Sequence, residues 1–135
     1  MLSKYIIIFS VLLFLKTGSI FSECISGDCT NGYGSAIFPK GDIYTGEWKN
    51  NQAEGKGQLV YKNGNIFFGE WKNGKANGIG EMIYDDKTRY VGEWLNSQAH
   101  GSGIVYDKDG NVLYSGKWKY GKKADKNKRV KKEKE

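Results

Sequence analysis

Alternating apolar and polar residues recur in short runs along this chain and predict β-strands. In the run Ile43–Trp48, the side chains of Tyr44, Gly46 and Trp48 fall on one face of an extended strand, because successive residues point to opposite sides. The order aromatic-x-Gly-charged-Trp returns three more times, at residues 67–71, 90–94 and 114–118. Residues 24–121 show no helical period, so the pattern predicts an all-β protein.

Two series of turn signals separate the predicted strands. One series follows the tryptophans: Asn50-Asn51, Asn73-Gly74, Asn96-Ser97 and Tyr120-Gly121. The other lies between the repeats: Lys40-Gly41, Asn63-Gly64, Asp86-Lys87 and Asp109-Gly110. Such pairs favour tight type I′ turns, in which both central residues have positive φ. The connections are too short for a crossover helix, so we expect an elongated, single-layer antiparallel β-meander of hairpins.

The four tryptophans of the chain, at positions 48, 71, 94 and 118, are spaced by 23, 23 and 24 residues. A fixed period of this length is typical of a repeat array, in which each unit buries its apolar face against its neighbours. We predict a repeat domain over residues 23–121, made of a half repeat (24–42), three repeats (43–65, 66–88 and 89–111) and a partial repeat (112–124). Tyr106 follows Gly103 one position earlier than the tyrosines of the sister repeats do, which predicts a bulge or altered turn near residues 104–113.

The N-terminal residues 1–22 have the features of a signal peptide, with a basic start at Lys4 and an apolar stretch that follows it. We therefore expect an exported protein in the periplasm, the cell envelope or the medium, with the cleavage point left open. An uncleaved N-terminal anchor and a lipoprotein acylated at Cys24 are the alternatives. In an oxidising compartment we expect Cys24 and Cys29 to form a disulfide, since a metal site would lack further His or Cys ligands.

The formal net charge of +6 is concentrated at the C-terminus. Residues 23–121 are close to neutral, whereas residues 122–135 are basic, have no apolar pattern and are expected to be disordered. This tail could bind an anionic membrane lipid or an envelope polyanion, and nucleic acid is not expected for an exported chain. A solubilising tail that blocks the open sheet edge is the alternative. The candidate anion-binding residues are Lys122, Lys123, Lys126, Lys128, Arg129, Lys131 and Lys132.

The repeated residues resemble the MORN (membrane occupation and recognition nexus) family. The matching sets are Tyr44/Gly46/Trp48/Gly55/Gly57, Phe67/Gly69/Trp71/Gly74/Gly78/Gly80, Tyr90/Gly92/Trp94/Gly101/Gly103 and Tyr114/Gly116/Trp118/Gly121. The fourth copy stops early, with Ala124 where glycine is expected. The resemblance covers about residues 32–121 and implies a single-layer β-sheet with an aromatic-lined groove. It also implies roles in protein–protein interaction, dimerisation or attachment to membrane lipids, without a conserved chemical activity.

The repeated rings have two interpretations. They line a binding groove, or they hold together a sheet that has little other core. The candidate groove residues are Tyr44, Trp48, Tyr61, Phe67, Trp71, Tyr84, Tyr90 and Trp94.

The remaining polar residues do not form a catalytic set. Glu47, Glu70 and Glu93 lie opposite the ring face and are expected to form a cross-strand charge ladder with lysines. His100 is expected to be solvated, and residues 107–111 fit a hairpin turn better than a calcium loop. We expect no catalytic residue, metal site or cofactor, and hence a non-enzymatic scaffold that binds a protein partner through the aromatic-lined sheet. Its oligomeric state is open, and an accessory subunit of an envelope enzyme is a further alternative.

Overall fold

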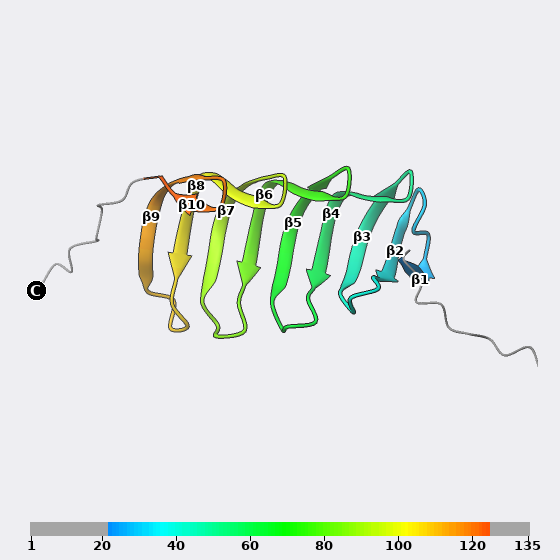
Figure 1. Cartoon of the computed structure of the whole chain (residues 1–135), viewed down its shortest axis with the longest axis horizontal. Coiled ribbons are helices and arrows are strands. Elements are labelled where there is room, and N and C mark those ends of the chain that lie inside the picture. Colours follow the sequence, from blue (N-terminus) through cyan, green and yellow to red (C-terminus); the bar gives the residue numbers. More distant parts are fainter. Residues whose placement is uncertain (1–21, 125–135) are drawn as a thin grey trace, which may run out of the picture.

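The computed structural model describes residues 22–124, which form one open antiparallel sheet of ten strands in chain order. The strands are β1 (Glu23–Gly27), β2 (Tyr33–Ile37), β3 (Ile43–Lys49), β4 (Gln52–Val60), β5 (Ile66–Lys72), β6 (Lys75–Ile83), β7 (Arg89–Leu95), β8 (Gln98–Tyr106), β9 (Val112–Lys119) and β10 (Lys122–Lys123). Each strand pairs with the one before and the one after it, so the sheet elongates from β1 to β10 (Figure 1). The predicted all-β, single-layer meander is confirmed. Over the described residues, no helix has the length and hydropathy of a membrane span.

The turns that follow the tryptophans are of the predicted type I′. Both central residues have positive φ, with values of 49° and 61° at Asn50 and Asn51 and of 49° and 76° at Asn73 and Gly74. The pair Asn96-Ser97 has the same conformation. Asparagine tolerates the left-handed region better than most residues that carry a Cβ, which explains its recurrence here.

The turns between the repeats differ from the prediction. Only the second residue of each predicted pair has positive φ, as at Gly64. In that turn the N–H of Tyr61 donates to the carbonyl of Asn65 at 2.9 Å, and the N–H of Gly64 donates to the carbonyl of Tyr61 at 3.0 Å. These bonds define a three-residue loop, a type I turn closed by one left-handed residue, and not a type I′ turn.

Lys87 occupies the left-handed position that glycine holds in the sister turns. Its φ is 68°, where a Cβ is sterically unfavourable. We expect Lys87→Gly to raise the free energy of unfolding by about 1 kcal/mol in urea denaturation. As a control, Lys72→Gly replaces an exposed lysine at the end of β5, where φ is not positive, and should lower the free energy of unfolding because glycine gains more backbone freedom in the unfolded chain. Equal effects of the two substitutions would contradict the prediction.

The sheet contains the predicted bulge together with bulges that the sequence analysis missed. Leu113 is the extra residue of β9, inserted between the pairs Val105↔Tyr114 and Tyr106↔Val112, which confirms the irregularity expected near residues 104–113. In addition, Glu47 lies opposite Glu54-Gly55-Lys56 where β3 pairs with β4. The pairs β5–β6 and β7–β8 carry the same irregularity. Each of these bulges contains a positive-φ glycine (Gly55, Gly78 or Gly101), which explains why this glycine series keeps the repeat period.

The N-terminal end of the sheet is tied by a disulfide. Cys24 and Cys29 are bonded, as expected, and this joins β1 to the loop before β2. Cys29 is half-buried and packs against the ring core. The disulfide therefore supports the first strand pair. The predicted signal peptide (1–22) lies outside the described residues except for Ser22.

The C-terminal end of the sheet continues past the predicted boundary at residue 121. Lys122 and Lys123 pair with Lys119 and Trp118 of β9. Lys123 pairs with Trp118 as Ala99 pairs with Trp94. Counted along the sequence from Lys123, the position that corresponds to Gly101 is therefore Asp125 and not Ala124 as expected. The remaining tail candidates, Lys126, Lys128, Arg129, Lys131 and Lys132, lie outside the described residues.

Candidate functional site

The aromatic face of the sheet holds a continuous ladder of edge-to-face rings. The ring centroid of Tyr44 lies 5.1 Å from that of Trp48 and 5.0 Å from that of Trp71 in the next repeat. Phe67 bridges Trp71 and Trp94 in the same way, and Tyr90 bridges Trp94 and Trp118. Each such pair contributes about 0.5–1.5 kcal/mol beyond the burial of its area, so the ladder joins each repeat to its neighbours.

Hydrogen bonds fix the positions of these rings. The indole N–H of Trp94 donates to the carbonyl of Gly80 at 3.1 Å, and that of Trp48 donates to the carbonyl of Gly34 at 3.0 Å. The hydroxyl of Tyr90 donates to the carbonyl of Glu93 at 2.9 Å. The rings therefore satisfy their own polar atoms inside the sheet and act first as structural residues.

The structure places the predicted groove residues in two groups. Six are buried in the ladder: Tyr44, Trp48, Phe67, Trp71, Tyr90 and Trp94. The other two lie at the inter-repeat turns, where Tyr61 is half-buried and Tyr84 is exposed. Tyr44, Trp48 and Trp71 also border a cleft of about 270 Å³ whose other walls include Phe38 and Leu59. The rings thus build the aromatic face, and a narrow cleft opens between them.

Burial raises the pKa of the Tyr90 hydroxyl to about 12, and the Glu93 carboxylate adds to this effect. The pKa of Tyr44 is raised by burial and by Glu47. The folded state thus holds these protons more tightly than the unfolded state, whose tyrosines ionise near pH 10. The resulting stability is present below pH 10 and is lost as the pH rises through about 12.

We therefore expect the thermal unfolding midpoint to fall between about pH 10 and pH 12, with tyrosine ionisation and unfolding coinciding in the ultraviolet absorbance. Tyr90→Phe removes one of the four tyrosines whose pKa is raised by burial (Tyr44, Tyr61, Tyr84 and Tyr90) and should make this decline shallower. Phe68→Leu, which changes an exposed side chain that does not titrate, is the control and should leave the slope unchanged. An identical slope in all three proteins would contradict the assignment.

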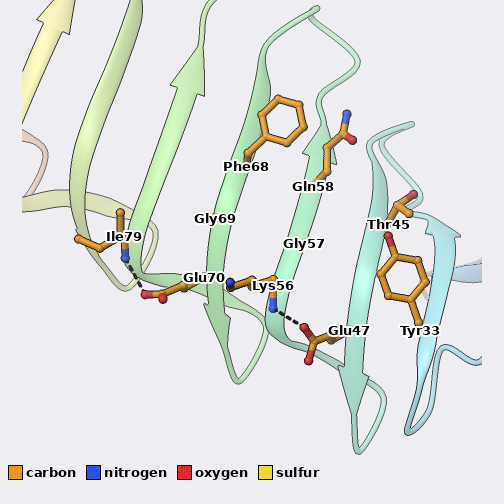
Figure 2. Close-up of a pocket in the computed structure, with 10 residues that line it drawn as sticks. All are labelled: Tyr33, Thr45, Glu47, Lys56, Gly57, Gln58, Phe68, Gly69, Glu70 and Ile79. Atoms are coloured by element: carbon orange, nitrogen blue, oxygen red, sulfur yellow. Dashed lines mark hydrogen bonds between the residues drawn. The ribbon is translucent and has the colours of Figure 1, made fainter.

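The opposite side of the sheet, here called the open face, carries a shallow hollow of about 550 Å³ over β2 to β6 (Figure 2). Figure 2 shows Phe68, Gln58 and Thr45 projecting from the neighbouring strands β5, β4 and β3. Phe68 is 42% exposed and Ile79 is 57% exposed, so two large apolar side chains meet solvent here. The sequence pattern predicted no site on this face, although strand alternation already set Phe68 opposite the buried rings.

The glutamates of the open face do not form the predicted charge ladder with lysines. The carboxylate of Glu47 accepts the backbone N–H of Lys56 at 3.1 Å, and that of Glu70 accepts the N–H of Ile79 at 2.8 Å (Figure 2). Glu93 accepts the N–H of Ser102 in the same way. Within residues 22–124, ion pairs form between Arg89 and Glu81 and between Lys108 and Asp109, and neither involves these carboxylates. The bulge turns a backbone donor toward each glutamate, which explains the repeated acidic residue.

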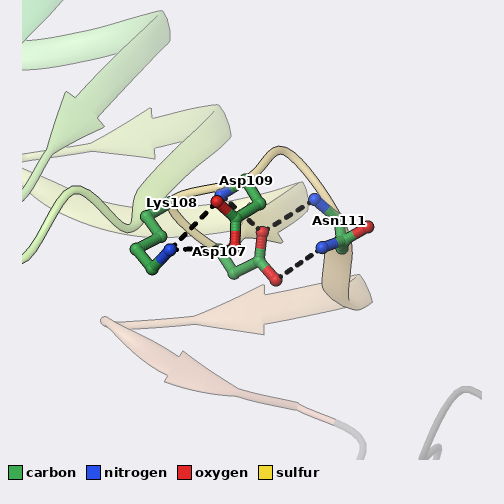
Figure 3. A network of polar contacts seen from close by, with 4 residues as sticks. All are labelled: Asp107, Lys108, Asp109 and Asn111. Carbon is green, nitrogen blue, oxygen red and sulfur yellow. Dashed lines mark hydrogen bonds and ion pairs between the residues drawn. The ribbon is translucent and has the colours of Figure 1, made fainter.

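Two further residues singled out in the sequence have structural partners. The Asp107 carboxylate accepts the N–H groups of Asp109 and Asn111 and the side-chain amide of Asn111, which closes the last hairpin loop (Figure 3). The hydrogen bonds from Asn111 lower the pKa of Asp107. His100 is half-buried, with its ring centroid 5.2 Å from that of Tyr120. In the described part of the chain, no cluster of three or more His, Cys, Asp or Glu side chains is arranged to hold a metal ion.

These observations define the class of protein: an open β-hairpin repeat array in which recurring aromatic rings and glycines form the contacts between neighbouring repeats. The chain belongs to the MORN repeat family, whose pattern matches residues 44–66, 67–89, 90–112 and 114–124. The MORN repeat is generally a non-enzymatic module. Its presence suggests a scaffold that interacts with proteins or membranes. No curated protein matches the chain.

Proposed function

We propose that this protein is a non-enzymatic, exported interaction scaffold that binds a protein partner on its sheet. The observation that carries the proposal is the exposure of Tyr33, Phe68 and Ile79 around one hollow, beside the charged residues Glu47 and Glu70. Apolar side chains exposed together within a polar rim are typical of protein-binding surfaces. The ring ladder holds this surface on a rigid support, which reduces the entropy lost on binding.

Two further observations support the scaffold and its export. The family module is generally non-enzymatic, which favours binding over chemistry. The Cys24–Cys29 disulfide is compatible with an oxidising compartment outside the cytoplasm. Mass spectrometry of the mature chain tests the export step, since cleavage near residue 22 should leave Cys24 close to the new N-terminus.

The partner-binding face is tested by substitutions on the two sides of the sheet. Phe68→Lys and Ile79→Lys change exposed side chains of the open face, and both should abolish recovery of a partner in affinity capture from the native envelope fraction. Tyr84→Lys changes an exposed ring at the edge of the aromatic face and is the matched control. If Tyr84→Lys removes the partner and the open-face variants retain it, the aromatic face around Tyr84 is the binding surface instead.

The alternative function is peripheral binding of an anionic membrane surface. The observation that favours it is the run of basic residues in 122–135, which begins with Lys122 and Lys123, exposed at the end of the sheet. Each lysine or arginine near an anionic bilayer contributes about 1 kcal/mol at low salt.

Truncation after Ala124 tests this alternative and keeps β10 intact. Co-sedimentation with phosphatidylserine vesicles should then be lost, and binding of the full chain should weaken steeply with salt. Binding that survives the truncation unchanged would exclude the tail as the lipid-binding element.

A further inference from the structure

Among the described residues, the outer edge of β9 is only partly paired. β8 pairs with β7 from Arg89 to Leu95, whereas β10 pairs only with Trp118 and Lys119 of β9. The bond from the N–H of Ala124 to the carbonyl of Lys117, at 2.8 Å, ends this pairing. Since alternate residues of a strand direct their backbone groups to the same side, Ser115 carries the next N–H and C=O on this edge. Within residues 22–124, the first half of β9 therefore offers backbone donors and acceptors to a further strand.

The sequence after β10 departs from the repeat at two restricted positions. In the preceding repeat, Gly101 has a φ of 62°, and Gly103 lies beneath the ring of Tyr90, where an added Cβ would overlap ring atoms. Counted along the sequence from Lys123, the corresponding positions hold Asp125 and Asn127. Both carry the Cβ that the repeat excludes, so the sequence disfavours a further regular strand of the repeat at these positions.

The residues along this edge describe the strand that would fit. Tyr114 is buried over Gly116 as Tyr90 is over Gly92, so the adjoining position of an incoming strand must again be glycine. On the open face, Lys117 replaces the glutamate found in the other repeats, and its ammonium donates to the Ser102 hydroxyl at 2.7 Å. Since that contact leaves its charge unpaired, the incoming residue beside it should be acidic.

The same edge disfavours pairing with a second copy of itself. In two copies brought edge to edge, β10 already covers Trp118 and Lys119 of each β9, so only the short first half of each strand is left to pair. Leu113, which is 53% exposed, forms a bulge in β9. This bulge disfavours pairing of the edge with any regular strand that happens to approach it.

We propose that the outer edge of β9 binds an extended segment of a partner protein as an additional antiparallel strand. The segment carries the pattern Gly-acidic-Gly, with its second glycine beneath the Tyr114 ring and its acidic side chain beside Lys117. Backbone hydrogen bonds supply the affinity of such strand addition, and the positions of glycine and charge supply its selectivity. This site lies at the end of the array and does not depend on the hollow of the open face.

A peptide with a sequence based on β4 tests the proposal with the full chain. The probe is the fluorescently labelled sequence of residues 52–61 with Lys56→Glu, which contains Gly55-Glu-Gly57. Fluorescence anisotropy should show that Gly57→Val in the peptide weakens binding by at least about tenfold. The peptide that keeps Lys56 should bind more weakly than the probe, and Lys117→Glu in the protein should reverse this order.

Variants of the edge locate the binding. Ser115→Pro removes the outward N–H at an edge position where proline is tolerated and should abolish binding, whereas Ser115→Ala should not. In the wild-type protein, the Ser115 amide should gain protection from hydrogen exchange when the probe is added. The proposal is overturned if the Gly57→Val peptide binds as well as the probe, if Lys117→Glu leaves the order unchanged, or if no peptide binds at millimolar concentration. Protection of Ser115 without peptide also overturns it, since the tail or a second copy then occupies the edge.

Discussion

Replacing Gly80 by alanine is expected to lower the free energy of unfolding by about 3 kcal/mol, although only one methyl group is added. Gly80 has no positive φ, so its backbone conformation suits alanine. The added Cβ would instead lie 2.5 Å from Cζ of Phe67, a buried ring held between Trp71 and Trp94. Neither the ring nor the strand can move away without breaking an adjoining contact in the ladder. Chemical denaturation of the purified chain measures the loss.

A control and a rescue separate this steric effect from backbone strain. Gly110→Ala adds a methyl group where nothing lies within 4 Å, but at a φ of 86°, and should cost only about 1 kcal/mol. Phe67→Leu in the Gly80→Ala background removes the overlapping ring edge and should recover part of the lost stability. If the two glycine variants lose equal stability, the overlap with Phe67 is not the cause.

Removing the indole of Trp94 is expected to destabilise the chain by about 4 kcal/mol. Trp94 is buried, contacts both Phe67 and Tyr90, and donates its N–H to Gly80. Trp94→Ala would therefore open a cavity and break the ladder in its middle. Because the units of a repeat protein are stabilised by their neighbours, we expect the denaturation transition to broaden as the two halves uncouple.

The equivalent substitution near the end of the array is the matched control. Trp118 is only half-buried, and the next ring position of the ladder is taken by Lys123, whose ammonium lies 4.5 Å from the centroid of Tyr114. We expect Trp118→Ala to cost about 2 kcal/mol and to keep a single sharp transition. Equal losses at Trp94 and Trp118 would contradict a ladder whose contribution depends on position.

The turns show where sequence reasoning succeeds and where it reaches its limit. Asn73-Gly74 forms the predicted type I′ turn, but Asn63-Gly64 has the same two residues and forms a three-residue loop. The difference lies in the register of the flanking strands. Around Asn73-Gly74, β5 and β6 pair up to Lys72↔Lys75, whereas around Asn63-Gly64 the pairing of β4 with β5 ends at Val60↔Ile66. Loop length, and not the dipeptide, decides the type of turn.

The open-face carboxylates show a similar limit. Alternation correctly placed Glu47 and Glu70 opposite the rings, but their partners are the backbone N–H groups of Lys56 and Ile79 and not lysine side chains. A pattern with a period of two cannot reveal a bulge that turns a backbone donor toward the face. The recurrence of Gly55 and Gly78 was the available signal, since positive φ at glycine often marks such a bulge.

The sequence by itself determined the strand order, the faces of the strands, the repeat period, the disulfide and the irregularity near Leu113. These features depend on residues that are close in the chain, or on a period that any single repeat displays. Only the tertiary structure decided that Tyr44, Phe67 and Tyr90 are core residues and that the apolar side chains left exposed include Phe68 and Ile79. The burial of each of these three rings depends on a tryptophan supplied by the following repeat, and that contact exists only once the hairpins have stacked.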